Sequence, residues 1–349
     1  MVFHDAGGAA AVAPLIPTLK DFYVCRTLAN DTAASVLSGC TVERCSSIKR
    51  NEAIKILREV SPHLLIAGTS AAGKTIDRTF IAAAKELHIP TLVILDYWSG
   101  YRIRFADTPH GDLHYLPDRI AVMDKDAQQE LIKLGIPPEQ VIVTGSPRFQ
   151  RVAQQTYDSK SSKAKLAGRY NIDSLKPWIL FLSQTFGNQE KARAEMGYTE
   201  RDAAKCLLDA IAARDVTLLV RLHPSENAGN RQLFKTVPCT FAQDIDINEL
   251  ISACDIVTGM STVALVDAYL MKKPVISIQP GQKNEDLCYL TSAGLIPKCQ
   301  STDAVRTYID KALNTIGFID FSKSSLFISD AFANNMALIA ELVANKRHG

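Results

Sequence analysis

The sequence predicts an α/β protein with two Rossmann-like domains, each built on a parallel sheet that helices cover on both faces. Short apolar runs rich in β-branched residues alternate with longer segments of helical spacing, which is the pattern of such sheets. The alternation occurs in two series, separated by a polar stretch. The chain has 349 residues, 47% hydrophobic and 22% charged, so it is too long for one compact core and too apolar to be disordered.

The first series fills the N-terminal half of the chain. One short strand leads through a glycine-rich turn into an expected helix over residues 11–19. Strands and helices then alternate as in one Rossmann-like domain. The further strands expected are residues 63–67, 91–95, 119–123 and 141–143, and the helices are residues 75–87 and 126–134.

The second series repeats this pattern in the C-terminal half. The strands expected there are residues 178–182, 217–221, 255–257 and 275–278, and the helices are residues 200–214 and 262–271. Between the series, residues 151–176 are rich in Ser, Lys and Gln, as at a domain junction. Apolar residues recur at helical spacing in residues 330–345, and we expect this helix to pack back across the junction. The predicted parts are an N-terminal domain (1–155), a linker (156–176), a C-terminal domain (177–329) and the final helix (330–349).

Charge and composition exclude several classes of protein. The 39 basic and 37 acidic residues give a net charge of +2, which argues against a nucleic-acid-binding protein and leaves room for a small anionic ligand. The eight cysteines lack zinc-site and disulfide-framework spacing and are expected to be reduced thiols. No basic, apolar leader and no run of bilayer length is present, so we expect a cytoplasmic protein with at most peripheral membrane contact.

The first candidate site is the turn that contains Asp5, Gly7 and Gly8. Glycines between a strand and a helix let backbone amides approach an anion at the positive end of the helix. The alternative is a tight turn beneath a closely packed helix. Ligands bind at the carboxyl ends of strands in such domains, and this position favours the functional interpretation.

A second candidate is the segment 68–75, which matches the phosphate-loop pattern GxxxxGKT. With Lys74, Thr75 and a magnesium-binding Asp96, it would make the chain a phosphate-transferring NTPase. Against this, phosphate-loop proteins usually carry the loop on an early strand, with the rest of the sheet around it. Here a whole second domain carries its own anion-site signals, so a turn of small residues is the alternative.

A third candidate follows the expected strand 91–95. Asp96 is placed to act as a general base on a hydroxyl group. Tyr97, Trp98 and Tyr101 are candidates for stacking on a sugar-like ligand, and Arg104 for holding an anion. The alternative is an aromatic loop with a structural Asp–Arg pair.

In the second half, His223 directly follows a buried strand, and Pro224 restricts its backbone. A histidine so placed can donate to a phosphate or to a developing negative charge, although a satisfied interface histidine is the alternative. Ser261 and Thr262 begin the expected helix 262–271, either as caps or as an anion cradle. Asp267 on that helix is expected to reach a ribose hydroxyl. Two more candidates lie in the neighbouring loop, Ser183 and Gln184.

Three segments together resemble a known architecture: Val-Thr-Gly-Ser-Pro-Arg-Phe at 143–149, Arg-Leu-His-Pro at 221–224 and the stretch 259–276. With the glycine-rich first turn, they resemble the two-Rossmann-domain GT-B architecture of glycosyltransferases. The nearest similarity is to the superfamily of UDP-N-acetylglucosamine 2-epimerases and bacterial surface-polysaccharide transferases. The His-Pro and Ser-Thr pairs also resemble those of bacterial sialyltransferases and CDP-glycerol transferases.

The resemblance implies two domains that face each other across a cleft. The C-terminal domain would bind most of the donor, and the N-terminal domain would bind the acceptor. The resemblance implies that the nucleotide sugar is bound by Gly7, Gly8, His223, Ser261, Thr262 and Asp267. We add Ser183, Gln184 and Arg221 to the predicted nucleotide-sugar site because they lie at the ends of neighbouring strands. The resemblance further implies that Asp96 or Asp5 activates the acceptor. The predicted catalytic residues are therefore Asp96, His223 and Asp5, and the predicted acceptor-binding residues remain Tyr97, Trp98, Tyr101 and Arg104. No metal or other cofactor is required in this scheme.

The function predicted from the sequence is a metal-independent glycosyltransferase of polysaccharide biosynthesis. It would move a sugar from a UDP- or CMP/CDP-linked donor to a glycan or small hydroxyl acceptor. The alternatives are a nucleotide-sugar epimerase or hydrolase on the same scaffold, and a phosphate-loop kinase or NTPase. A nucleotide-sensing module without catalysis is a further alternative. No nucleic-acid partner is expected, and the oligomeric state stays open.

Overall fold

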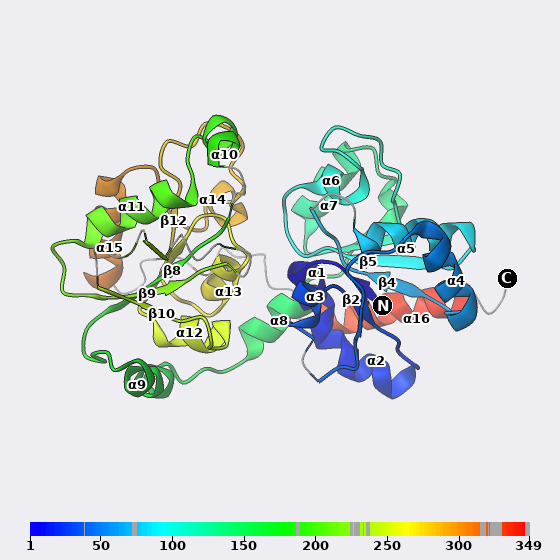
Figure 1. The fold of residues 1–349 in the computed structure, drawn as a ribbon, viewed down its shortest axis with the longest axis horizontal. Helices are drawn as coiled ribbons and strands as arrows, with labels where there is room; N and C mark the ends of the chain where they lie inside the picture. The colour runs from blue at the N-terminus through cyan, green and yellow to red at the C-terminus, as the bar shows by residue number, and fades with distance from the viewer. Residues whose placement is uncertain are drawn as a thin grey trace. The chain divides into compact units, whose positions relative to one another are not determined.

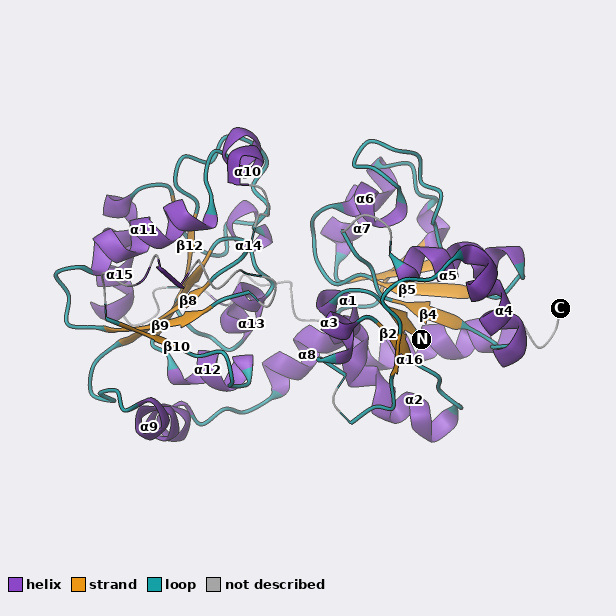
Figure 2. Cartoon of the chain, in the orientation of Figure 1, coloured by secondary structure: helices purple, strands orange, loops and turns teal. Residues whose placement is uncertain are grey.

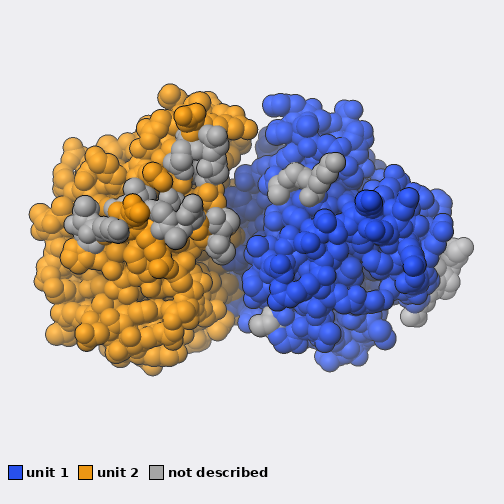
Figure 3. Space-filling model, in the orientation of Figure 1, with its two compact units in different colours: residues 1–151, 325–349 blue, residues 152–324 orange. Residues whose placement is uncertain are grey.

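The computed structural model describes residues 1–37, 39–71, 75–185, 189–223, 226, 231–232, 234, 238–314, 319, 321 and 330–345. The chain forms two compact units (Figure 3). Unit 1 comprises Met1–Arg151 and Ser325–Gly349, and unit 2 comprises Val152–Ser324. Each unit has the α/β architecture that the sequence predicts (Figure 2).

Within the described residues, unit 1 contains one seven-stranded sheet in the order β3-β2-β1-β4-β5-β6-β7. Every pair of neighbouring strands is parallel, so all these strands end at the same edge. The strands are β1 (Val2–Phe3), β2 (Leu28–Ala29), β3 (Glu43–Arg44), β4 (Leu65–Ala67), β5 (Thr91–Ile94), β6 (Arg119–Val122) and β7 (Val141–Val143).

Helices connect the strands of unit 1, and the longer ones bury one face. In α4, Ala53, Ile54 and Leu57 form the buried stripe, and the helix ends at Ser61 in a left-handed conformation. Asp124 caps α7 by accepting a hydrogen bond from the Ala127 amide at 2.8 Å. The helices are α1 (Ala6–Val12), η1 (Ala13–Leu15), α2 (Ile16–Phe22), α3 (Asp31–Ala34), α4 (Arg50–Val60), α5 (Ile76–Glu86), α6 (Tyr101–Phe105), α7 (Lys125–Lys133), η2 (Pro138–Gln140) and α8 (Pro147–Gln154).

The C-terminal helix α16 (Ala331–Asn345) returns from unit 2 to unit 1, where it is red in Figure 1. Leu338, Ile339 and Leu342 are buried in the same apolar cluster as residues of β1 and α1. The Asn335 side chain donates to the carbonyl of Gly145 at 3.2 Å, in the turn after β7. The prediction that the final helix packs back across the junction is therefore confirmed.

Unit 2 contains, in its described part, a six-stranded parallel sheet in the order β10-β9-β8-β11-β12-β13. Thr199 begins α11 with a capping box, in which its hydroxyl and the Asp202 carboxylate satisfy each other's backbone amides. The strands are β8 (Trp178–Leu182), β9 (Thr217–Arg221), β10 (Cys239–Phe241), β11 (Ile256–Gly259), β12 (Val275–Ile278) and β13 (Lys298–Cys299). The helices are α9 (Ser159–Tyr170), α10 (Gln189–Met196), α11 (Glu200–Ile211), α12 (Ile247–Ala253), α13 (Ala264–Leu270), α14 (Tyr289–Ser292) and α15 (Thr302–Asn314).

The predicted linker 156–176 differs from an open connector, because it contains α9 and belongs to unit 2. Its polar side chains pair with unit 2: Lys163 with Asp255 at 2.7 Å and Lys165 with Glu249 at 2.6 Å. The composition that suggested a linker therefore reflects a helix that is held partly by ion pairs. The expected first helix also starts earlier, at Ala6, so Gly7 and Gly8 lie inside α1 and not in a turn before it.

No helix among the described residues is long and apolar enough to cross a membrane. All eight cysteines lie in the described part of the chain and are free thiols.

Candidate functional site

The strands β1, β4 and β5 are neighbours in the unit 1 sheet, so the loops at their carboxyl ends meet. These loops carry Asp5, the hydroxyls of Thr69 and Ser70, and Asp96. Asp5 accepts a hydrogen bond from the Ser70 hydroxyl. The structure thus brings the two predicted catalytic carboxylates, Asp5 and Asp96, to one edge of the same sheet.

Asp96 is held by two donors on one of its oxygens. Thr69 donates to Oδ1 at 2.8 Å, and Nη1 of Arg104 donates to the same oxygen at 2.5 Å. The Arg104 side chain is only 6% exposed and that of Asp96 is 17% exposed. Arg104 therefore binds a carboxylate of its own chain, as the alternative interpretation of a structural Asp–Arg pair expects. Its predicted role in holding an acceptor has no support from this contact.

Gly7 and Gly8 let α1 approach this edge closely. A Cβ atom on Gly7 would overlap Oδ2 of Asp96, and one on Gly8 would lie 2.8 Å from the Thr69 amide nitrogen. The two glycines thus permit close packing of the helix on the loop after β4 and on Asp96. This corresponds to the alternative of a closely packed helix, and it gives the glycines a role other than the predicted contact with a diphosphate.

The aromatic residues after β5 pack within unit 1. Nε1 of Trp98 donates to Oδ2 of Asp124 at 2.8 Å, and the indole ring stacks on Phe149 with ring centroids 5.4 Å apart. Tyr97 meets Trp98 edge to face at 5.7 Å. Tyr101 is half-buried, and burial raises its pKa. Trp98 and Phe149 thus anchor the loop to the 143–149 segment, and the predicted stacking on an acceptor does not follow from these positions.

The phosphate-loop pattern is described only in part, because Lys74 and its two preceding residues lie outside the described residues. The Thr69 hydroxyl donates a hydrogen bond to Asp96, and the Ser70 hydroxyl donates one to Asp5. Thr75 is buried and stands at the start of α5. The first part of the segment therefore orients carboxylates of the candidate site.

Sequence reasoning missed two buried charged residues of α5. Arg78 donates to the carbonyls of Ser70 at 3.0 Å, Ile103 at 2.5 Å and Ala106 at 2.8 Å, and so connects the loop after β4 to α6. Burial lowers the pKa of Arg78 and raises that of Asp77. The available signal was the pair Asp77–Arg78 in the first turn of a helix that continues with the apolar run 80–84.

In unit 2, the adjacent strands β9, β8 and β11 bring a second set of predicted residues together. Oε1 of Gln184 accepts hydrogen bonds from both the amide and the hydroxyl of Ser261, each at 3.1 Å. Ser183 donates to Glu226 at 2.8 Å, and the His223 amide donates to the other oxygen of Glu226 at 2.6 Å. The His223 side chain is exposed at this edge, and Thr262 is half-buried beside Ser261.

Glu226 was missed in the sequence, although it lies three residues after His223. Its two oxygens join the loop after β8 to the loop after β9. Gln184 likewise joins the loop after β8 to the loop after β11. Four predicted residues (Ser183, Gln184, His223 and Ser261) are thus connected through two acceptor side chains.

Two predicted residues of unit 2 are placed differently. Nη1 of Arg221 donates to the carbonyls of Ala242 at 2.7 Å and Ile245 at 2.9 Å, so it stabilises the chain after β10. Burial lowers the Arg221 pKa. Asp267 is 0% exposed within α13, so the predicted contacts of Arg221 with a donor and of Asp267 with a ribose do not follow from these positions.

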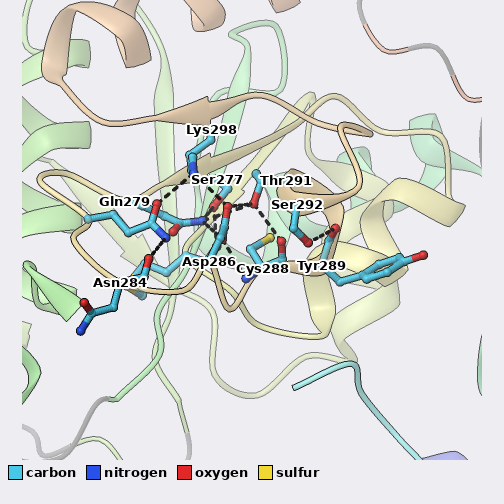
Figure 4. A network of polar contacts seen from close by, with 11 residues as sticks. Ser277, Gln279, Asn284, Asp286, Cys288, Tyr289, Thr291, Ser292 and Lys298 are labelled. Atoms are coloured by element: carbon cyan, nitrogen blue, oxygen red, sulfur yellow. Dashed lines mark hydrogen bonds and ion pairs between the residues drawn. The ribbon is translucent and has the colours of Figure 1, made fainter. Parts of the chain in front are cut away.

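Behind the loop after β11 lies a buried polar network (Figure 4). Ser277 donates to the Met260 carbonyl at 2.5 Å, and Nε2 of Gln279 donates to Ser277 at 2.9 Å and to Asp286 at 2.8 Å. Thr291 donates to the second oxygen of Asp286 at 2.7 Å. Burial acts to raise the pKa of Asp286, but these hydrogen bonds together lower it. The network supports the residue that precedes Ser261.

Among the described residues, no group of three or more His, Cys, Asp or Glu side chains is arranged to hold a metal ion.

The fold matches solved structures over nearly the whole chain. *Neisseria meningitidis* UDP-GlcNAc 2-epimerase, bound to UDP-GlcNAc, aligns with a TM-score of 0.71 at 15% identity and covers 99% of this chain and 98% of its own. S. aureus MnaA, in complex with UDP, aligns with a TM-score of 0.68 at 15% identity, and the alignment covers 98% of this chain and 96% of MnaA. Anabaena HepE, in complex with UDP-glucose, aligns with a TM-score of 0.61 at 14% identity, and the alignment covers 99% of this chain and 96% of HepE.

No protein-family model and no curated protein sequence matches the chain. At these identities the structural likeness establishes the fold. The chain has the GT-B-like, two-Rossmann-domain fold found in the UDP-GlcNAc 2-epimerase superfamily, as its sequence motifs predicted.

Proposed function

We propose that this chain is an enzyme that acts on a nucleotide sugar and that unit 2 holds the nucleotide. The fold likeness carries this proposal, because three proteins that match over nearly their whole length were solved with UDP, UDP-GlcNAc or UDP-glucose. The carboxyl edge of the unit 2 sheet has suitable groups for a diphosphate. They are the exposed His223 imidazole and the hydroxyl of the half-buried Thr262.

We place a nucleotide-sugar epimerase or hydrolase ahead of the predicted glycosyltransferase, because the matches include a UDP-GlcNAc 2-epimerase. An enzyme that alters a carbon of the sugar itself needs an acid and a base beside the ring. Asp5 and Asp96 are the candidates in unit 1. Ser70 orients the first carboxylate, while Thr69 and Arg104 orient the second.

A glycosyltransferase is the second candidate. *Anabaena* HepE was also solved with UDP and glucose together, a pair that corresponds to a separated nucleotide and sugar. The phosphate-loop NTPase has less support, since Thr69 and Ser70 already donate to carboxylates of the chain.

The test is product analysis with the full chain and one donor at a time, UDP-GlcNAc or UDP-glucose. A sugar epimer or free UDP formed without any acceptor supports the epimerase or hydrolase. Product that forms only after a hydroxyl acceptor is added supports the transferase. Asp96→Asn is expected to lower turnover by about 10²–10⁴-fold and to leave UDP binding unchanged.

The control is Asp310→Asn, which neutralises an exposed carboxylate that pairs with Arg214 in unit 2. Its turnover should equal that of the wild type. Absence of UDP binding, combined with magnesium-dependent ATP turnover that Lys74→Ala abolishes, would overturn the proposal.

A further inference from the structure

Unit 1 contains a small cavity of about 240 Å³. Its walls come from three parts of the chain: the loop after β3, the first turn of α5 and the segment that follows α6. The strands β3 and β4 end at one edge of the parallel sheet, and α5 follows β4. The cavity therefore lies at the edge where such sheets bind ligands.

Hydroxyl groups dominate the polar lining. Ser46 and Ser47 are exposed on one wall, and Thr75 and Thr79 lie on the opposite element. The Thr75 hydroxyl is buried and interacts with the side chain of Asp77. Ser46 and Ser47 therefore provide the hydroxyls that a ligand in the cavity can reach.

The third wall combines a carboxylate with an aromatic ring. The Tyr115 hydroxyl donates to Asp107 at 2.8 Å, and the guanidinium carbon of Arg78 lies 6.0 Å from the Tyr115 ring centroid. Arg78 also donates to three backbone carbonyls, and this holds the wall in place. Asp107 is exposed and retains lone pairs for further donors.

These groups distinguish between classes of ligand. The volume lies below the ~300–1,000 Å³ typical of sites for drug-sized ligands, so it suits a single ring and excludes a whole nucleotide sugar. Arg78 is the one cation among the described residues of the lining and already donates to three backbone carbonyls, so the exposed Asp107 carboxylate disfavours an anion. The hydroxyls of the lining disfavour a purely apolar ligand. A carboxylate, several hydroxyls and one aromatic ring together match a molecule with many hydroxyl groups and an apolar ring face.

We propose that this cavity binds one neutral monosaccharide ring. The inference goes beyond the proposed function, because the cavity lies within unit 1 and its ligand carries no nucleotide. A sugar here would also touch an element that supports the candidate site. Arg78 holds the Ser70 carbonyl, and the Ser70 hydroxyl donates to Asp5.

The test measures binding of glucose, galactose, mannose and N-acetylglucosamine to the full chain by saturation-transfer NMR, without nucleotide. At least one of these sugars is expected to bind. Ser47→Ala and Asp107→Ala should each weaken its binding by about tenfold, the loss of one hydrogen bond. Both residues are exposed, so the variants are expected to fold. The matched control is Ser35→Ala, an exposed serine of unit 1 that does not line the cavity.

Failure of all four sugars to bind overturns the proposal, as does sugar binding that neither cavity variant weakens. Inorganic phosphate is the anionic probe, and phosphate binding that Ser47→Ala abolishes also overturns it. UDP is tested separately on each variant. Sugar binding without UDP binding sustains this inference and counts against the proposed function, whereas UDP binding without sugar binding does the reverse.

Discussion

The backbone of Gly7 in α1 lies against the carboxylate of Asp96 after β5, so closely that a methyl group on Gly7 would overlap Oδ2 of Asp96. The other carboxylate oxygen binds Thr69 and Arg104. Asp96 is thus enclosed by a helix backbone on one side and two side-chain donors on the other. Each of these contacts yields a prediction for a specific variant.

Gly7→Ala is expected to destabilise the protein by about 1–3 kcal/mol, because the new methyl group forces α1 and Asp96 apart. Turnover should fall with it. Urea unfolding measures the change in stability. The control is Gly168→Ala in α9, where a Cβ would meet nothing within 4 Å, and it should stabilise the protein by about 0.5–1 kcal/mol. Equal effects of the two substitutions would contradict the packing argument.

Arg104→Met is expected to cost about 3 kcal/mol, because it leaves the largely buried Asp96 carboxylate without its cation. Arg26→Met breaks an ion pair whose two side chains are each 51% exposed, and it should cost less than about 1 kcal/mol. Chemical unfolding of both variants gives the comparison. Similar losses would mean that the Asp96–Arg104 pair contributes no more than a surface ion pair.

Glu226→Ala is expected to weaken UDP binding by about tenfold, because Glu226 joins Ser183 to the His223 amide. The concentration dependence of the UDP-induced rise in melting temperature measures this loss. Glu249→Ala removes a carboxylate that pairs with Lys165 elsewhere in unit 2 and serves as the control. If both variants bind UDP as the wild type does, Glu226 does not organise a nucleotide site.

Asp77 predicts a pH dependence of stability. Burial raises its pKa in the folded protein above the unfolded value of about 3.9. The folded state then binds the proton more tightly, so this group's contribution to stability is complete below about pH 3.9 and is lost as pH rises towards the folded pKa. The Asp77→Asn variant carries no titrating group at this position and does not lose this contribution. As the pH rises from about 3.9 to the folded pKa of Asp77, its stability relative to the wild type should therefore increase.

Urea unfolding of wild type and Asp77→Asn between pH 3 and pH 8 checks this difference. Other titrating groups are common to both proteins and largely cancel. The charged and titratable groups that interact with Asp77 are His4, Asp5 and Arg78. A stability difference that stays constant across the range would show that Asp77 does not carry a raised pKa.

The strong local patterns predicted the framework well. The expected strands 178–182 and 217–221 coincide with β8 and β9, since β8 is a continuous apolar run of five residues and β9 contains the apolar run 218–220. By contrast, β2, β3 and β13 have two residues each, too few to show any period, and they were missed. The α9 segment was taken for a linker because its partners, such as Asp255 and Glu249, lie more than 80 residues away.

By itself, the sequence determined the two parallel sheets, the returning final helix and the loops that carry polar residues, because periodicity and turn residues are local properties of the chain. Only the tertiary structure decided what those polar residues contact. His223 and Asp267 both follow strands of unit 2, yet one is exposed and the other fully buried. Asp96 likewise contacts Gly7, Thr69 and Arg104 from three separate segments. Strand order and helix packing create these contacts between distant segments, and no local pattern records them.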